Sequence, residues 1–122
     1  MKHRTVLSID LYSTHVNVLV ADTIYKALKQ VYCHKEMPKE YWGKTTAVFN
    51  ISPNKNCWSL AFKKGNVTAG TIAHECLHLT FAIMSSKGIK LGNKSEEAFT
   101  YLHGYLVDEV TGIIKSAGVK IW

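Results

Sequence analysis

The sequence predicts an α+β fold in one domain that spans residues 1–122. A chain of 122 residues is long enough for one hydrophobic core and leaves little room for a second domain. Short β-branched runs come first, and two stretches with helical periodicity follow one another near the C-terminal end. This order favours a largely antiparallel or mixed sheet with the helices on one side.

The first third of the chain is expected to form a β-hairpin and a helix. Residues 5–21 contain two β-branched runs with apolar residues at every second position, which is typical of strands. Tyr12–His15 can turn between them, and one long strand is the alternative. Asp22 is a candidate N-cap for a helix over Thr23–Cys33, where apolar residues recur at helical spacing. Residues 34–44 are polar and are expected to form a loop.

The middle of the chain predicts a second pair of strands. Thr45–Ile51 and Cys57–Phe62 are short segments rich in β-branched and aromatic residues. Residues 52–56 between them combine serine, proline and asparagine, which favour a turn. The two strands are therefore expected to be sequential neighbours in the sheet.

Two helices are expected near the C-terminal end. Thr68 is a candidate N-cap for a helix that runs to about Ser86, and Gly88 suits the left-handed position that ends it. The last helix is expected from about Ser95 to Ser116, where the apolar residues form one stripe. Because the connector is short, the two helices are expected to lie side by side.

The composition argues against several classes of protein. The net charge is +6, but Arg4 is the only arginine, and the lysines are scattered and form no basic stripe. Nucleic-acid binding is therefore not expected, since arginine is the usual contact to guanine and phosphate. No apolar run approaches the ~20 residues of a membrane span. Polar residues also interrupt the segment after the basic N-terminus, where a secretory signal would be apolar.

The cysteines favour a cytoplasmic protein. Their number is odd, no Cys-x-x-Cys pair occurs, and a disulfide scaffold of this size would need more of them. The three are Cys33, Cys57 and Cys76. Cys76 is expected to be a buried apolar residue rather than a nucleophile or a ligand.

The sequence His74-Glu75-Cys76-Leu77-His78 is an HExxH motif inside an expected helix. At about 100° per residue, His74 and His78 leave the same face one turn apart, so both imidazoles can reach one Zn²⁺. Glu75 lies beside them, where a carboxylate can take a proton from water without binding the metal. Cys76 and Leu77 are expected to point toward the sheet and the core. The alternative is a pair of surface histidines with a solvated glutamate.

A catalytic zinc site takes a third protein ligand and keeps a fourth position open. Glu96 and Glu97, at the start of the last expected helix, are the candidates. Asn93 as N-cap would give Glu96 a role in a capping box. Glu97, which shares its helix face with Tyr101 and Gly104, is therefore preferred. Both carboxylates could instead act only on the helix dipole.

These residues resemble the gluzincin branch of the zincin metallopeptidases. The resemblance is carried by Thr71–His78 with its HExxH motif and by Ser95–Ala98, and it extends over residues 45–110. In that family a second helix supplies a glutamate, often followed by alanine, as the third zinc ligand. The chain length and the segment Glu97–Leu106 also resemble small zincin-like proteins encoded by phages and prophages.

The resemblance implies a minimal zincin-like fold with a Glu-bearing helix packed on the HExxH helix. It implies zinc ligands at His74, His78 and Glu97 and a general base at Glu75. The expected function is that of a zinc-dependent metallopeptidase, which hydrolyses a peptide or protein substrate with water activated by the metal. The alternative is a metal-binding module of zincin fold that acts through a protein partner without catalysis.

The resemblance also implies a place for the substrate, and the sequence departs from the family at one position. Cys57–Phe62 would border the cleft and pair with an extended substrate. Many gluzincins carry an aspartate four residues after the ligand glutamate, where this chain has Tyr101. The Tyr101 hydroxyl could still orient an imidazole or stabilise an oxyanion. The remaining histidines are expected to be surface residues or to face away from the site; they are His3, His15, His34 and His103.

Overall fold

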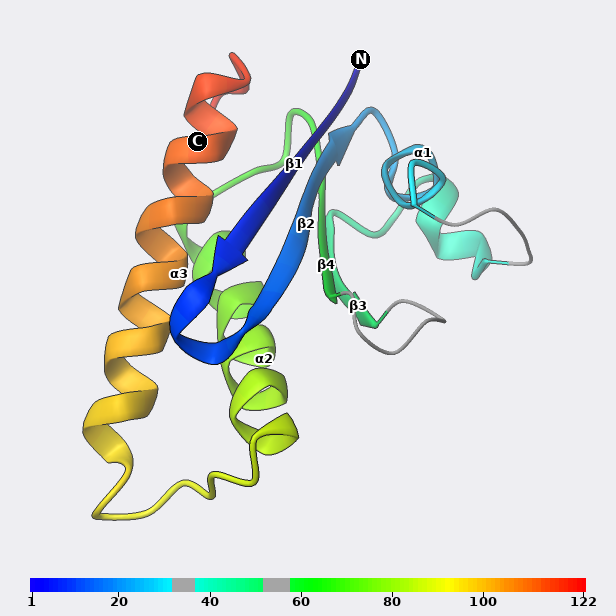
Figure 1. Ribbon diagram of the computed structural model, residues 1–122. Coiled ribbons are helices and arrows are strands. Elements are labelled where there is room, and N and C mark those ends of the chain that lie inside the picture. Colours follow the sequence, from blue (N-terminus) through cyan, green and yellow to red (C-terminus); the bar gives the residue numbers. More distant parts are fainter. Residues whose placement is uncertain (32–36, 52–57) are drawn as a thin grey trace.

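The computed structural model describes residues 1–31, 37–51 and 58–122, and it has an α+β fold (Figure 1). In chain order the elements are β1 (Lys2–Ile9), the 3₁₀ turn η1 (Asp10–Tyr12), β2 (Thr14–Ala21), α1 (Ile24–Leu28), the 3₁₀ turn η2 (Lys39–Trp42), β3 (Ala47–Ile51), β4 (Trp58–Lys63), α2 (Ala69–Ser86) and α3 (Glu96–Ser116). The predicted α+β class is therefore confirmed.

The four strands form one mixed sheet in the order β1-β2-β4-β3. β1 and β2 pair as an antiparallel hairpin, β2 and β4 are parallel, and β4 and β3 are antiparallel. The two predicted pairings, of β1 with β2 and of β3 with β4, are present. The parallel pairing of β2 with β4 arises where the chain returns to the sheet after α1. The sheet thus has β2 and β4 at its centre and β1 and β3 at its two edges.

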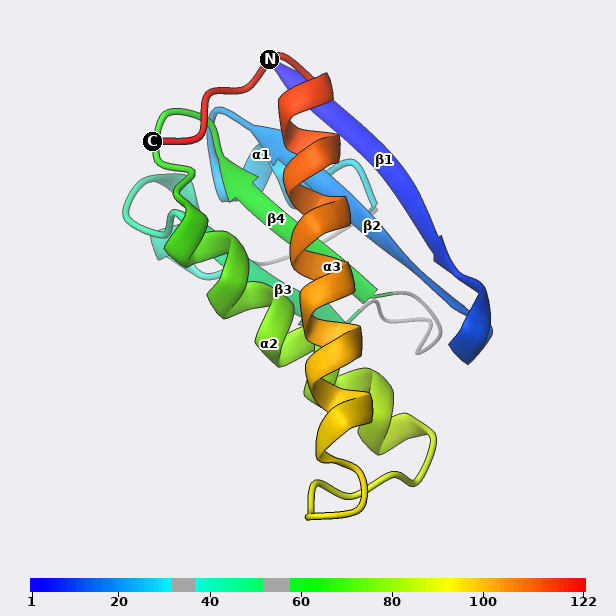
Figure 2. The same cartoon turned by 90° about the vertical axis from the view of Figure 1, so that its left-hand side faces the viewer.

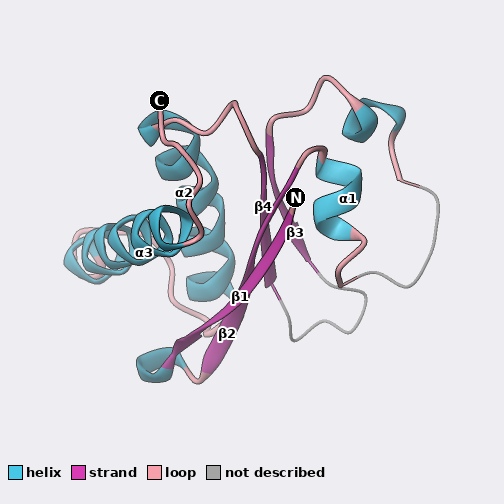
Figure 3. Ribbon diagram, turned by 90° about the horizontal axis from the view of Figure 1, so that it is seen from above, coloured by secondary structure: helices cyan, strands magenta, loops and turns pink. Residues whose placement is uncertain are grey.

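Helices cover both faces of the sheet, so the expectation of helices on one side is wrong. The central strands accordingly bury apolar residues on both of their sides. Figure 3 shows α2 and α3 on one face and α1 on the other. Along β2, Val16, Val18 and Val20 belong to the core beneath α2 and α3. Leu19 and Ala21, which alternate with them, belong to a smaller core with α1. Alternate residues of a strand point to opposite faces, so both sets are buried.

The hairpin and the first helix differ in detail from the predictions. The hairpin turn is formed by η1 and by Ser13, whose φ of 49° is left-handed, so the turn comes earlier than Tyr12–His15. α1 is shorter than predicted, and Thr23 is its N-cap, accepting a hydrogen bond from the backbone N–H of Lys26. Asp22 instead pairs with the N-terminal ammonium group at 3.0 Å. The predicted end of this helix lies outside the described residues.

The two long helices agree with the prediction, but the cap of the second does not. Thr68 caps α2 in a capping box with Thr71, and Gly88 adopts a φ of 73° just after the helix. α3 begins at Glu96, and its N-cap is Ser95. The proposed capping box between Asn93 and Glu96 is therefore wrong. The Ser95 hydroxyl instead binds the connector, at the backbone of Lys90 and Gly92.

α3 lies between α2 and the hairpin turn on the same face of the sheet (Figure 2). Its buried stripe is Phe99, Leu102, Leu106, Val110 and Ile114. None of the helices in the described parts of the chain combines the length and the apolar character that crossing a bilayer requires.

Candidate metal centre

The periodicity of α2 separates a buried face from a face that carries two imidazoles. Ile72, Cys76, Leu79 and Ile83 are fully buried against the sheet. His74 and His78 lie on the opposite side and are exposed. Because an α-helix has about 3.6 residues per turn, a stripe at this spacing leaves the histidines together on the solvent side. The predicted placement of the HExxH motif is confirmed.

The two imidazoles point to a common position. Their Nε2 atoms are 3.2 Å apart, and the ring planes are inclined by 76°. Two nitrogen ligands of one tetrahedral zinc ion, each at ~2.0–2.1 Å from it, are separated by about 3.4 Å. The observed separation therefore fits a pair of ligands on one ion.

Glu75 lies next to the imidazoles but is more deeply buried than they are. Its side chain is only 11% exposed, whereas that of His74 is 67% exposed, and its Oε2 atom is 3.9 Å from His74 Nε2. The carboxylate is thus next to the position where the imidazoles converge, as a proton acceptor must be.

The two middle residues of the motif behave differently from one another. Cys76 is buried as predicted, and burial first, then the charge of Glu75, raises the pKa of its thiol to about 12. A neutral thiol at physiological pH is a poor nucleophile and a poor ligand. Leu77 was expected to face the core as well, but it is 43% exposed, so that prediction is wrong. It projects about 100° further round the helix than Cys76, beyond the stripe that the sheet covers.

The strand beside the motif is β3 and not β4. The His78 ring lies against Phe49 of β3, with centroids 6.4 Å apart and planes inclined by 14°. β4 is paired on both sides, with β2 and with β3. The prediction that Cys57–Phe62 pairs with a substrate is therefore wrong, because a central strand has no free side. β3 has only one neighbouring strand in the described sheet.

The third predicted ligand does not lie with the first two. Within residues 1–31, 37–51 and 58–122, no third His, Cys, Asp or Glu forms a metal-binding group with other such side chains. The short connector places the first turn of α3 beside the last turns of α2, as the contact between Phe99 and Phe81 shows, with ring centroids 5.6 Å apart. Glu96 and Glu97 are exposed there. His74 lies about two turns earlier on α2, roughly 10 Å along its axis from Phe81.

His103 of α3 contacts the backbone of α2 close to the motif. Its Nε2 atom is 3.0 Å from the carbonyl oxygen of Ala73, the residue before His74. His103 thus leaves α3 on another side than Glu97, as expected, and contacts the backbone of α2 rather than the imidazoles. His103 follows the buried Leu102, so it lies at the border of the buried stripe. A polar side chain at such a border can reach a neighbouring helix, and this position could have indicated the contact from the sequence.

The contact of His103 also shows which side of α3 faces α2. Glu96 is about 20° from His103 around the helix, whereas Glu97 is roughly 120° away. The two glutamates thus leave α3 on different sides, with Glu96 on the side of α2. The preference for Glu97 as a ligand stays a prediction.

Tyr101, the other predicted catalytic residue, lines a cavity on the far flank of α3. The cavity has a volume of about 590 Å³ and lies between α3 and the hairpin turn. Tyr101 is 74% exposed there. No interaction found among the described residues joins Tyr101 to His74 or His78, so its predicted role beside the imidazoles stays a prediction.

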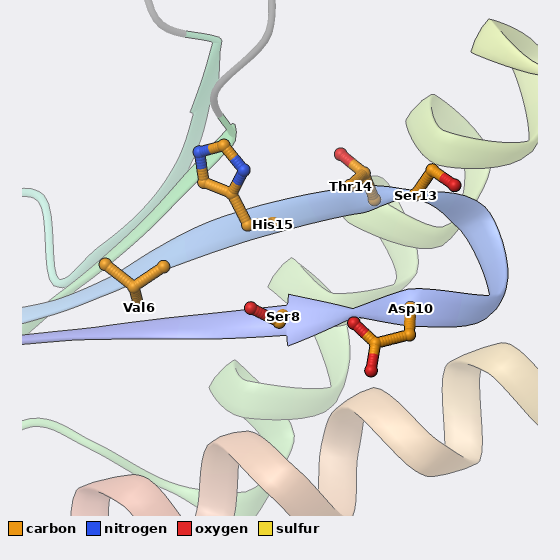
Figure 4. Close-up of a pocket in the computed structure, with 6 residues that line it drawn as sticks. All are labelled: Val6, Ser8, Asp10, Ser13, Thr14 and His15. Atoms are coloured by element: carbon orange, nitrogen blue, oxygen red, sulfur yellow. The ribbon is translucent and has the colours of Figure 1, made fainter.

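The other histidines have separate surroundings. His3 is hydrogen-bonded to the Thr5 hydroxyl at 2.7 Å, and His34 lies outside the described residues. His15 lines a shallow polar hollow of about 440 Å³ at the hairpin turn, shown in Figure 4 with Val6, Ser8, Asp10, Ser13 and Thr14. The hollow has one imidazole and one carboxylate, which is too few protein ligands for a zinc site.

Comparisons of the chain with models of protein families, with curated proteins and with solved structures find no match. The resemblance to gluzincins therefore rests on the residues of the two motifs, Thr71–His78 and Ser95–Ala98. The described geometry adds the convergence of the imidazoles and the position of Glu75.

Proposed function

We propose that this protein is a zinc-dependent metallopeptidase in which His74 and His78 bind the metal and Glu75 is the general base. The observation that carries the proposal is the 3.2 Å separation of the two Nε2 atoms on the exposed face of α2. At this distance one imidazole can donate a hydrogen bond to the other, and the same spacing also suits two ligands of one ion.

The chemistry follows from the side chains around this point. When bound, Zn²⁺ acts as a Lewis acid that polarises a carbonyl group and lowers the pKa of water. Glu75 accepts a proton from water and passes it to the leaving amine. An extended substrate along β3 would bring its peptide groups next to His78, because Phe49 of β3 contacts that ring.

The third ligand is proposed to come from the first turn of α3. The family resemblance favours Glu97, and the side of the helix that faces α2 favours Glu96. Either carboxylate would have to approach the middle of α2 from beside its end. This approach would require the connector and the first turn of α3 to move, and Phe99, the buried residue of that turn, would move with them.

The position of the glutamates also supports the second candidate, a metal-binding module without catalysis. A site with two imidazoles and no third ligand in place can be completed by a side chain from a protein partner. In that case zinc affinity would be weak in the isolated chain and would rise when the partner is added.

The first experiment measures zinc by titration calorimetry and by metal analysis of the purified protein. We expect about one equivalent of Zn²⁺ in the wild type and none after the double substitution His74→Ala with His78→Ala. The matched control is His15→Ala with His3→Ala, which removes two imidazoles elsewhere and should leave zinc binding unchanged. A full equivalent in the first double variant would refute the proposed site.

The second experiment separates the enzyme from the module. Glu75→Gln should retain zinc and reduce cleavage of a peptide library by at least ~100-fold, the usual effect of losing a positioned acid–base group. If the wild type and Glu75→Gln both bind zinc and are equally inactive, the module is favoured. Equal cleavage by both would show that Glu75 is not the base.

The third ligand is decided by comparing Glu97→Gln with Glu96→Gln. The ligand variant should lose zinc affinity strongly, because a charged ligand is removed. The other variant should retain the metal and change the free energy of unfolding by less than ~1 kcal/mol, as expected for one carboxylate at a helix N-terminus.

A further inference from the structure

A surface groove runs between α3 and the edge strand β1, on the flank of α3 away from α2. Its wider part is the cavity of about 590 Å³ at the hairpin turn, and a second cavity of about 450 Å³ lies further along the same two elements. The linings adjoin, because Ser8 belongs to the first cavity and Leu7 to the second. The helix supplies Tyr105 to the first and Glu109, one turn later, to the second.

The floor of the groove is apolar and its walls are aromatic. Ile9 and Leu102, at the floor, are 3% and 5% exposed. Three tyrosines line the wider part, namely Tyr12, Tyr101 and Tyr105. Leu11 stands at its margin with 85% of its surface exposed, which is unusual for a leucine in a chain whose other leucines are mostly buried. Such an exposed apolar and aromatic surface is typical of a binding site.

The charge of this flank is opposite to that of the protein. The chain has a net charge of +6, yet no lysine or arginine is among the described residues that line the two cavities. Asp10 lines the wider cavity and Glu109 lines its continuation. Partial burial, then the charge of Glu109 and a hydrogen bond to it, and the charge of Asp10 raise the pKa of the Tyr105 hydroxyl. Both carboxylates therefore act on the aromatic wall itself.

We propose that the groove between β1 and α3 binds an extended basic segment of a partner protein, with lysine or arginine side chains over the tyrosine rings and apolar side chains on the floor. Aromatic faces attract ammonium and guanidinium groups, and the two carboxylates add charge complementarity. An extended chain suits the shape, because the groove follows the strand β1. The proposal does not depend on the metal centre, which lies on α2 beyond the opposite flank of α3.

The test uses a blocked peptide of about eight residues with alternating leucine and lysine, which at ~3.3 Å per residue is as long as β1. Binding is measured by titration calorimetry without added zinc, in low and physiological salt. We expect binding that weakens as salt increases. Asp10→Asn with Glu109→Gln, and separately Tyr101→Ala, should each weaken it at least about tenfold. Glu40→Gln, a carboxylate of η2 far from the groove, is the matched control and should change nothing.

Several outcomes would overturn the proposal. They are equal binding of a peptide with glutamate in place of lysine, absence of binding to the wild type, and unchanged binding in the groove variants. Light scattering could also overturn it. If the wild type is a dimer and Tyr101→Ala is a monomer, a second copy of the chain occupies the groove. The substituted side chains are all at the surface, so circular dichroism should show that each variant is folded.

Discussion

The two edges of the sheet are built alike but differ in chemistry. At the β3 edge, α2 presents two imidazoles whose Nε2 atoms are 3.2 Å apart, next to the ring of Phe49. At the β1 edge, α3 presents Tyr101, Tyr105 and Glu109, and the hairpin turn adds Asp10, around an apolar floor. The first arrangement suits a metal ion, and the second suits an organic cation.

The comparison shows that one core supports two surfaces that can be altered independently. Both helices bury one stripe in the same hydrophobic core, and their exposed sides carry the chemistry. His74 and Tyr101 can therefore be substituted without opening a cavity. If the two edges are independent, loss of zinc should leave the groove intact, and loss of the groove should leave zinc binding intact.

The largest expected effect on stability comes from the shared core. Leu79→Ala on α2 and Leu106→Ala on α3 should each lower the free energy of unfolding by ~2–5 kcal/mol, because both side chains are fully buried. Leu77→Ala, on the exposed side of α2, is the matched control and should cost less than ~0.5 kcal/mol. Urea unfolding measures all three, and a large loss for Leu77→Ala would show that a partner surface or α3 covers it.

A smaller effect is expected at the start of the HExxH helix. Thr68→Ala removes the side chain that accepts the backbone N–H of Thr71 at 3.0 Å and should cost about 1 kcal/mol. Thr100→Ala within α3 is the control, since an exposed threonine inside a helix gains helix propensity when it becomes alanine. Thermal unfolding compares the two. An equal loss for both would mean that the cap of α2 contributes nothing specific.

The smallest expected effect is the pH dependence at the β1 edge. The pKa of Tyr105 is raised in the folded protein above the ordinary value of 10.0. The folded state thus disfavours the phenolate, so the related stability is fully present below about pH 10 and decreases as the pH rises through the folded pKa. Unfolding measured across alkaline pH should show a smaller decrease for Tyr105→Phe, and Glu109→Gln should lower the pKa of Tyr105. If the pH dependence of unfolding is the same in both variants as in the wild type, Glu109 does not act on Tyr105 in the groove.

Much of the fold could be predicted from local patterns. The two long helices follow from their apolar stripes, and Thr68 and Gly88 mark the start and end of α2 because capping is a local interaction. The hairpin follows from the alternation in β1 and β2. Local patterns were less reliable where a distant group competes: Asp22 looked like a cap, but the N-terminal ammonium binds it.

The candidate site could be predicted only in part. His74 and His78 converge because they lie one turn apart on the same helix, and their spacing in the sequence predicts this. The strand next to them could not be identified, because it depends on β2 entering the sheet beside β4 and leaving β3 at the edge. The surroundings of Leu77 and His103 depend on how α3 packs against α2. Local sequence patterns do not predict that packing.

The sequence by itself determined which residues share a helix face, where α2 begins, and that two imidazoles lie one turn apart. Only the tertiary structure decided what lies opposite these faces. The short connector brings α3 back beside the end of α2, so His103 reaches Ala73 while Glu97 stays in solvent. It also brings Tyr101 and Tyr105 next to the hairpin turn. The reason is physical: spacing along one helix is fixed by its backbone hydrogen bonds, whereas contacts between elements depend on how their apolar stripes pack together.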